Sequence, residues 1–443
     1  MASELKQLGE LLDIIIDHRG KTPRKLGGDF VDIGIPVISA IHIKNGIIQW
    51  DERERFVTTE MFAKWMPVKL QKDDVLLTSE APLGEVALVP SNDDLVLSQR
   101  LFALRCNNEV LDPKFLYYFF RSSLGALALE KRASGSTVIG IRQTELLKIE
   151  IPLFGMKLQK AAGEILGSLD DKIRLNTELS QTLEAITQTI FKSWFVDFDP
   201  VHAKMRGEKP EGMSDEVAAL FPDSFEESEL GLIPTGWEVT LLGQHLNVVK
   251  GKSYKSSELS SSQTALVTLK SFRRGGGYRL DGLKPFTGSF KPEQQIFPGE
   301  LVVSFTDVTQ AADVIGKPAL VLPNPAYEKL VASLDVGIVR PTSRKTSTNF
   351  LYQLFLTSDF KSHIDGYTNG TTVLHLSKGA LEDYLAILPP EKLIKRFEEI
   401  AGPLRDVVTQ IYLESITLEE LRDSLLSRLI TGELEIPSEM LAS

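Results

Sequence analysis

The feature that most constrains the fold is an internal duplication. The segment at residues 133–152, ASGSTVIGIRQTELLKIEIP, returns in altered form at residues 368–389 as TNGTTVLHLSKGALEDYLAILP. Gly135 and Gly370 lie 235 positions apart, and nearly the same offset recurs along each half. Further anchors are Leu169 with Leu404 and Gly9 with Gly243. Because a repeat of this length has the size of a domain, we predict two domains of one fold.

Each half is predicted to contain short strands, because its apolar segments are rich in β-branched residues and are separated by turn-forming residues. The first half supplies GIPVIS, DVLLTS, EVALVP and RLFALR, and the second supplies TALVTL, ELVVSF, PALVLP and VGIVRP. One short helix interrupts each half, around Pro113–Ser122 and Asn349–Thr357. A chain of 443 residues is long enough for two such cores. The predicted fold class is α+β: two similar mixed α/β domains in a pseudo-twofold internal repeat.

Each half ends in a long helix with a heptad pattern of apolar residues. In the first helix the pattern is formed by Leu158, Ala162, Ile165, Leu169, Lys172, Asn176, Leu179, Leu183, Ile186 and Ile190. In the second helix it is formed by Leu393, Phe397, Ile400, Leu404, Val407, Ile411, Glu414, Leu418, Leu421 and Leu425. So narrow a stripe suits another helix better than a globular core. We therefore expect the two helices to pack on each other as a coiled-coil-like spacer. The alternative is that each helix lies on its own domain.

Polar residues interrupt both heptad patterns. Lys172 and Asn176 interrupt the first helix and Glu414 the second, at different places. Such interruptions favour a single register and orientation. Gly402 and Pro403 lie inside the second helix, where we expect a kink.

Two similar surfaces on one chain suit an extended polymer, and duplex DNA presents equivalent groove faces about 34 to 36 Å apart per turn. Because the two halves differ in their loops, the sequence that they read would be split and asymmetric. The net charge of −11 argues against a nucleic-acid partner at first sight, but the charge is unevenly distributed. Between Lys250 and Gln295, nine basic residues face three acidic ones.

Basic and small polar residues gather in loops at matching places of the two halves. DHRGKTPRK and VKGKSYKSS suit contacts with phosphates, while AIHIKNG and LKSFRRGGGYRL suit contacts with base edges. The candidate DNA-binding residues of the first half are Arg19, Lys21, Thr22, Arg24, Lys25, His42, Lys44, Asn45, Ser79, Ser134, Ser136 and Thr137. Those of the second half are Lys252, Ser253, Tyr254, Lys255, Lys270, Arg273, Arg274, Tyr278, Arg279, Thr306, Asn369, Thr371 and Thr372. The alternative for each of them is a solvated loop.

The patterns divide the chain into five segments. These are a first domain (1–152), a central helix (153–196), an acidic linker (197–235), a second domain (236–388) and a C-terminal helix (389–436). Between Gly207 and Leu232 the linker has eight carboxylates and one lysine. We expect it to be an exposed connection whose charge keeps it away from DNA.

Other kinds of site find little support in the sequence. The single cysteine, Cys106, cannot form an internal disulfide or a thiolate cluster, so a small buried residue is expected. The triglycine that begins at Gly275 lacks the Lys-Ser/Thr of a nucleotide-binding loop. DFDPVH, at Asp197–His202, resembles a metal-ligand cluster, but Pro200 interrupts it, so we expect a structural joint and no metal. No general acid and base pair stands out, which indicates a protein that recognises a ligand rather than one that catalyses a reaction.

The sequence also bears on location. No stretch approaches the roughly twenty apolar residues of a membrane span. The amino terminus has no basic leader before an apolar run. We therefore expect a soluble, cytoplasmic protein.

The region around the end of the first long helix is the most distinctive. The segment Ser168–Gly207, SLDDKIRLNTELSQTLEAITQTIFKSWFVDFDPVHAKMRG, resembles the central conserved region of the specificity subunit of type I restriction-modification systems. LLTSEAPLGEVALV and the SGST…IPL ending of the first half resemble the same family. The resemblance covers essentially the whole chain. One departure lies at Phe154 and Gly155, where the family commonly has a proline-rich entry to the helix.

The resemblance implies that each domain is a target-recognition domain for one half of a bipartite DNA site. It implies that the two helices form an antiparallel pair that sets the gap and docks two methyltransferase (modification) subunits. Those subunits would carry S-adenosylmethionine, and separate motor and nuclease (restriction) subunits would use ATP and Mg. The chain itself would hold no cofactor and catalyse nothing. Two other classes remain open: a two-headed adaptor or scaffold for peptides or carbohydrate, and a nuclease whose site the sequence does not reveal.

Overall fold

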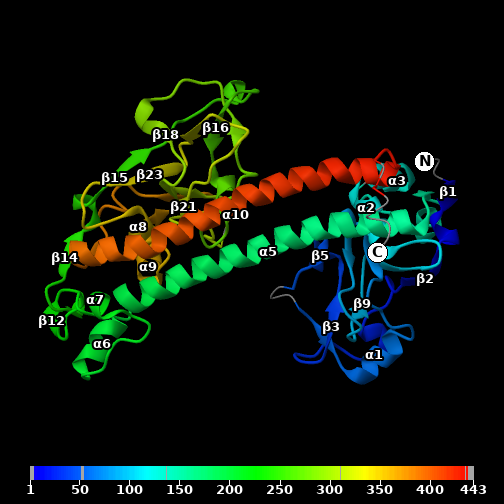
Figure 1. Cartoon of the computed structure of the whole chain (residues 1–443), viewed down its shortest axis with the longest axis horizontal. Coiled ribbons are helices and arrows are strands. Elements are labelled where there is room, and N and C mark those ends of the chain that lie inside the picture. Colours follow the sequence, from blue (N-terminus) through cyan, green and yellow to red (C-terminus); the bar gives the residue numbers. More distant parts are fainter. Residues whose placement is uncertain (1–3, 51–53, 136, 310, 435, 438–443) are drawn as a thin grey trace. The chain divides into compact units, whose positions relative to one another are not determined.

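The computed structural model describes residues 4–50, 54–135, 137–309, 311–434 and 436–437. The chain forms two compact units: unit 1 is Met1–Leu175 with Ser415–Ser443, and unit 2 is Asn176–Glu414. The boundary falls inside two long helices, α5 (Met156–Phe195) and α10 (Glu391–Thr431) (Figure 1). Each unit therefore combines one mixed domain with a part of each helix. The α+β fold class predicted from the sequence is confirmed.

A four-stranded antiparallel sheet of order β2-β10-β7-β8 forms the centre of unit 1, and α2 packs on β7 and β8. Its elements are β2 (Leu12–Asp17), β7 (Val75–Ser79), β8 (Leu83–Leu88), β10 (Leu101–Cys106), α2 (Pro113–Arg121) and α3 (Ser123–Arg132). A smaller sheet joins β6 (Phe56–Val57), β3 (Ile35–Ile38) and β9 (Val96–Leu97). The remaining elements are β1 (Glu4–Gln7) paired with β11 (Glu150–Leu153), the hairpin β4 (Ile43–Lys44) and β5 (Ile47–Ile48), α1 (Thr59–Trp65) and α4 (Gln143–Leu146).

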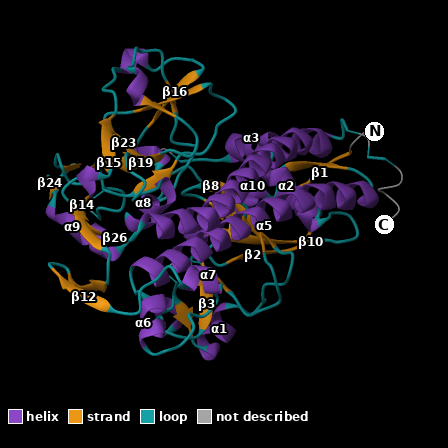
Figure 2. Cartoon of the chain, turned by 60° about the vertical axis from the view of Figure 1, so that its left-hand side comes forward, coloured by secondary structure: helices purple, strands orange, loops and turns teal. Residues whose placement is uncertain are grey.

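Unit 2 repeats this plan, with a central antiparallel sheet of order β15-β23-β19-β21 (Figure 2). Its elements are β15 (Leu246–Lys250), β19 (Leu301–Ser304), β21 (Pro318–Leu320), β23 (Val336–Pro341), α8 (Thr348–Leu354) and α9 (Ser358–Gly366). The second sheet is β17 (Lys284–Pro285), β16 (Thr264–Val267), β22 (Lys329–Ala332) and β18 (Gln295–Ile296). β14 (Glu238–Leu241) pairs with β26 (Leu385–Leu388), and β20 (Thr306–Asp307), β25 (Leu374–Leu376) and β24 (Thr368–Asn369) form a third sheet.

Both faces of each central sheet are covered, which explains why its strands are apolar throughout. In β7, Val75 and Leu77 belong to the core shared with α2, whereas Leu76 belongs to the core on the opposite face. In β19, Leu301 and Val302 separate in the same way between two cores.

The duplication extends to individual interactions. Asp112 caps α2 and Ser347 caps α8, and each side chain accepts the backbone N–H three residues later. A half-buried ion pair joins Arg105 to Asp74 at 2.7 Å in unit 1. Its counterpart joins Arg340 to Glu300 at 2.6 Å in unit 2, 235 positions later for the arginine. The two domains therefore share a polar framework as well as a strand order.

The segment predicted as an exposed acidic linker, residues 197–235, is instead folded within unit 2. It forms α6 (Asp199–Met205), α7 (Asp215–Ala218) and the hairpin β12 (Phe225–Ser228) and β13 (Gly231–Pro234). Val201, Val217 and Phe221 are buried in the core that contains Trp194 of α5. The carboxylates lie at the surface while the apolar residues between them pack inward, so the net charge of the segment did not reveal its fold.

In unit 1, α5 and α10 are joined by one carboxylate. Asp170 of α5 accepts hydrogen bonds from the Tyr118 hydroxyl at 2.7 Å, from the Arg121 guanidinium of α2 and from the Arg422 guanidinium of α10 at 2.8 Å. The Asp170 side chain is 22% exposed. We call Asp170, Tyr118, Arg121 and Arg422 the Asp170 cluster. It connects the domain to both helices.

In unit 2, one polar interruption of each heptad pattern meets the other. The Asn176 side-chain amide donates to the Glu414 carboxylate at 2.9 Å. Further along α5, Phe191 lies 5.7 Å from Phe397 between ring centres. Contacts that pair ascending positions of α5 with descending positions of α10 show that the helices run antiparallel in this unit, as they do in unit 1.

The predicted seam is buried only in part. Asn176 and Ile411 are buried, and Leu158, Ile165, Leu169, Leu183, Ile400, Leu404, Leu418 and Leu425 are half-buried. In contrast, Leu179, Ile186, Val407 and Leu421 of the predicted pattern are exposed, as is Leu175. The contact between the two helices therefore covers only part of the predicted seam.

Pro403 lies inside α10, which continues through it as one helix. The expected kink at this point stays a prediction. The helix ends at Thr431, five residues before the predicted limit, because Gly432 has a φ of 72° and ends the helix in the left-handed conformation.

Replacing Asp170 by alanine is expected to destabilise unit 1 by about 2–4 kcal/mol, because two guanidinium groups and a hydroxyl lose their shared acceptor. Urea unfolding measures the change. The matched control is Asp171→Ala. The Asp171 side chain is 70% exposed, and Arg174, which lies 3.3 Å from it, is 49% exposed. The effect of this substitution should stay within about 0.5 kcal/mol. Equal effects of the two substitutions would contradict a structural role for the cluster.

Candidate nucleic-acid interface

In unit 1 a surface site forms where β7 ends. Ser79, its last residue, donates its N–H to the Arg100 carbonyl at 2.8 Å and accepts the Ile141 N–H at 2.9 Å. Glu80 pairs with Gly140 as an isolated bridge. The end of β7, the turn before β10 and the loop carrying the repeated SGSTV motif therefore meet. We call this junction the strand-end site.

Unit 2 builds the same strand-end site with other side chains. Phe305 donates its N–H to the Asp335 carbonyl at 2.7 Å and accepts the Leu376 N–H at 2.9 Å. Thr306 pairs with His375, as Glu80 pairs with Gly140 in unit 1. The backbone of the site is thus conserved between the domains while its side chains differ.

The two SGSTV-type loops share one glycine conformation. Gly135 and Gly370 have φ values of 128° and 116°, and a Cβ on either would lie 2.1 Å from the carbonyl oxygen of Val138 or Val373. Only glycine suits such a backbone. Four predicted DNA-binding residues are exposed on these loops: Ser134, Thr137, Thr371 and Thr372. Asn369 is also exposed and donates to the Ser377 hydroxyl at 2.6 Å, and Ser136 lies outside the described residues.

Arg100 is a residue of the strand-end site that sequence reasoning missed. Its side chain is 52% exposed, with Nε 3.1 Å from a carboxylate oxygen of Glu80. Its backbone adopts a φ of 63°, which is costly for a residue with a Cβ. In the sequence, Arg100 opens the apolar run RLFALR, which predicts a place within the strand, whereas β10 begins at Leu101. The repeat contained a signal for this position, because Arg100 aligns with a residue of opposite charge, Asp335.

The loops that were predicted to read base edges lie elsewhere in each unit. In unit 1, Lys44 and Asn45 are exposed at the turn between β4 and β5, where Asn45 has a φ of 55°. The turn packs on α2, because the Tyr117 hydroxyl donates to the Gly46 carbonyl at 3.0 Å.

In unit 2 the matching loop exposes Lys270, Arg273, Arg274 and Arg279. Arg274 is 79% exposed and 3.6 Å from Asp313, while Arg279 forms a two-point ion pair with Asp281. Arg273 lies near α5: desolvation raises the pKa of Glu184, and the charge of Arg273 opposes part of that rise.

The loops predicted to hold phosphates differ between the units. In unit 1, the Lys21 ammonium donates to the Trp65 carbonyl and that of Lys25 to the Gly20 carbonyl, both at 2.8 Å. Arg24 is 86% exposed and 3.9 Å from Asp29, and Thr22 is half-buried. In unit 2, Ser253 and Lys255 are exposed, Lys252 is half-buried, and the half-buried Tyr254 accepts a hydrogen bond from Lys284 at 3.2 Å.

Five predicted DNA-binding residues are placed in structural roles. His42, Ser79, Thr306 and Tyr278 are buried, with exposures between 2% and 6%. Arg19 uses its guanidinium to grip Asp17 and to reach the Ile141 carbonyl at 3.3 Å. This burial and pairing argue against direct DNA contact by these side chains. Spacing along the chain cannot show that a polar group has a partner 122 residues away, as Arg19 has.

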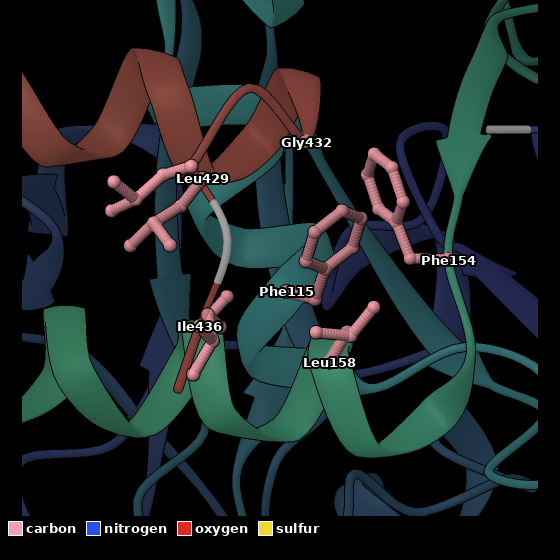
Figure 3. A pocket seen from close by; sticks show the side chains of 8 residues that line it. Phe115, Phe154, Leu158, Leu429, Gly432 and Ile436 are labelled. Carbon is pink, nitrogen blue, oxygen red and sulfur yellow. The ribbon is translucent and has the colours of Figure 1, made fainter. Parts of the chain in front are cut away.

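Two hollows lie in unit 1. An apolar hollow of about 20 Å³ lies where α10 ends (Figure 3). Phe115 and Phe154 meet edge to face there, beside Leu158 and Leu429. This volume is about that of one water molecule. A polar hollow of about 400 Å³ contains the Arg105–Asp74 ion pair together with Asp13 and Lys160. Its lining has four aspartates and three basic residues, so opposite charges largely offset one another.

Two further observations narrow the chemistry. Within the described parts of the chain, histidine, cysteine and carboxylate side chains nowhere gather in threes as metal ligands would. The helices of those parts are likewise too polar or too short to span a bilayer.

Comparison with known proteins places this architecture in a class. Residues 2–185 match the family described as type I restriction modification DNA specificity domain. The type I restriction enzyme MjaIX specificity subunit of Methanocaldococcus jannaschii is 24% identical over 444 residues, which cover 98% of this chain and 93% of the relative. The HindI specificity subunit of Haemophilus influenzae is 26% identical over 431 residues, which cover 82% and 87%. The crystal structure of the type I S subunit from M. genitalium has the same fold, with a TM-score of 0.55 at 16% identity over 97% of this chain and 99% of that one.

Residues 2–185, which form the first domain and most of α5, match the type I DNA specificity domain. Over nearly its whole length the chain is similar to type I specificity subunits, which are the non-catalytic component of restriction-modification systems, and it has the same fold as one of them. The resemblance noted in the sequence is confirmed.

Replacing Gly370 by alanine is expected to destabilise unit 2 by about 1–3 kcal/mol, because the new Cβ would meet a carbonyl oxygen in a backbone conformation that alanine avoids. Gly366→Ala is the control, since Gly366 ends α9 and a Cβ added there would have nothing within 4 Å; it should be neutral or stabilising. Thermal unfolding compares the two. A neutral Gly370→Ala would show that the loop relaxes freely.

Proposed function

We propose that the chain reads a bipartite, asymmetric site on double-stranded DNA, with one half-site for each domain. The observation that carries the proposal is the repeated strand-end site, whose backbone is the same in both units and whose side chains differ. A shared backbone would present both readers to a duplex in the same way. Different side chains would give the two half-sites different sequences.

We propose that the α5–α10 pair sets the gap between the half-sites and docks two methyltransferase subunits. Exposed apolar side chains on the helices support docking. Leu179, Ile186 and Val407 of unit 2 expose apolar surface to water, and a bound partner would remove that surface from water. Similarity to type I specificity subunits supports the same assignment. S-adenosylmethionine would be bound by those partners, and ATP and Mg by motor and nuclease subunits, in the cytoplasm.

Methylation mapping tests the proposal directly. The chain is produced with its methyltransferase in a host that lacks other adenine methylation, and modified bases are located across the genome. The expected result is two short motifs at one fixed separation. A single continuous motif, or several separations, would contradict reading by two domains on a fixed spacer. Binding of peptides or carbohydrate without DNA would favour an adaptor instead.

Arg274→Ala is expected to relax only the half-site read by unit 2, by about 1–3 kcal/mol at one base pair, because its exposed guanidinium can reach a base edge. Arg279→Ala is the control, since Asp281 already occupies that fork. Competition binding by the assembled complex to duplexes with single base changes measures both. Equal weakening on every duplex would identify Arg274 as a phosphate contact.

A further inference from the structure

One position of the strand-end site carries opposite charges in the two units. Arg100 and Asp335 stand 235 positions apart in the repeat. The Arg100 carbonyl accepts the N–H of Ser79, the last residue of β7, at 2.8 Å. The Asp335 carbonyl accepts the N–H of Phe305, the residue after β19, at 2.7 Å. The backbone frame is therefore the same while the side chain changes from a guanidinium to a carboxylate.

We propose that this position determines sequence specificity in each half-site: Arg100 selects guanine and Asp335 selects cytosine at the equivalent base. The inference rests on the proposed function and adds to it the residue and the base. A carboxylate and a guanidinium in one frame cannot prefer the same base edge, because one accepts hydrogen bonds and the other donates them.

Arg100 has the geometry of a reader. Glu80 lies 3.1 Å from Nε, which orients the guanidinium. Among the described residues, no hydrogen bond occupies the two terminal nitrogens of Arg100. Two such nitrogens side by side match the O6 and N7 acceptors of guanine. Arg19, another arginine of unit 1, differs because its fork is filled by Asp17.

Asp335 has the complementary geometry. The Thr306 hydroxyl donates to one of its carboxylate oxygens at 2.9 Å, which fixes the side chain. The other oxygen has no hydrogen-bond donor among the described residues. A fixed acceptor of this kind suits the N4 amino group of cytosine. Thr306 thus orients Asp335 as Glu80 orients Arg100.

The test uses the assembled methyltransferase complex and methylation mapping. Arg100→Gly removes the side chain and suits the φ of 63°, so the fold should be retained. We expect one base pair of the first half-site to lose its preference by about 10- to 100-fold, with the second half-site unchanged. Asp335→Asn is the reciprocal control and should affect only the second half-site. Arg100→Asp, a residue that tolerates this backbone, should move the preference of the first half-site from guanine toward cytosine.

The outcomes separate this inference from the proposed function. If the complex without substitutions yields no bipartite motif, the proposed function fails. If it yields one and Arg100→Gly leaves both half-sites unchanged, or lowers methylation equally at all sites, the specificity role of Arg100 is overturned. Thermal unfolding of Arg100→Gly guards against a folding defect; should its midpoint fall, Arg100→Asn, which also adopts a positive φ, takes its place with the same expected loss.

Discussion

The alignment of the two long helices in unit 1 depends on the carboxylate of Asp170. It is the common acceptor for one hydroxyl and two guanidinium groups, and these donors come from the domain and from α10. Burial and the adjacent carboxylate raise the pKa of Tyr118, so its hydroxyl stays protonated and remains a donor. Apolar contacts alone would tolerate several arrangements of two helices, whereas three directed hydrogen bonds to one residue tolerate one.

The duplication shows how one fold can carry two different sets of surface side chains, which the proposed reading of two half-sites requires. Partly buried ion pairs such as Arg105–Asp74 and Arg340–Glu300 keep the same place in both domains, because losing one partner leaves an uncompensated charge. The left-handed glycines of the SGSTV-type loops are kept for a steric reason. Exposed side chains on the same backbone are subject to neither restriction. Arg100 can therefore occupy the position that Asp335 occupies in the other domain. Comparison of the two halves therefore separates the residues that stabilise the fold from the residues proposed to recognise DNA.

The sequence predicted the features that depend on local pattern. The repeat, three of the four strands of each central sheet and the two long helices were predicted from pattern, and the structure contains them, whereas β2 and β15 were not among the predicted strands. Features that depend on distant partners were not visible. His42 was predicted to bind DNA, but its ring is buried, accepts the Ser39 N–H and lies 5.4 Å from the exposed Trp50 ring. The linker was predicted from its charge, yet the apolar residues between its carboxylates decide its fold. Asn176 and Glu414 were recognised as polar interruptions, but not as partners, because they lie 238 residues apart.

The polar contacts between the helices bear directly on the proposed fixed separation of the two half-sites. A heptad pattern matches itself again after seven residues, so its apolar positions alone would accept a slip of about 10 Å. Along a duplex, about 10 Å corresponds to roughly three base pairs. A slip of α10 by seven residues would place Arg422 and Glu414 opposite new neighbours and leave Asp170 and Asn176 without their partners. The cost of unpaired, partly buried charges and amides is what makes one register, and hence one gap, decisively favourable.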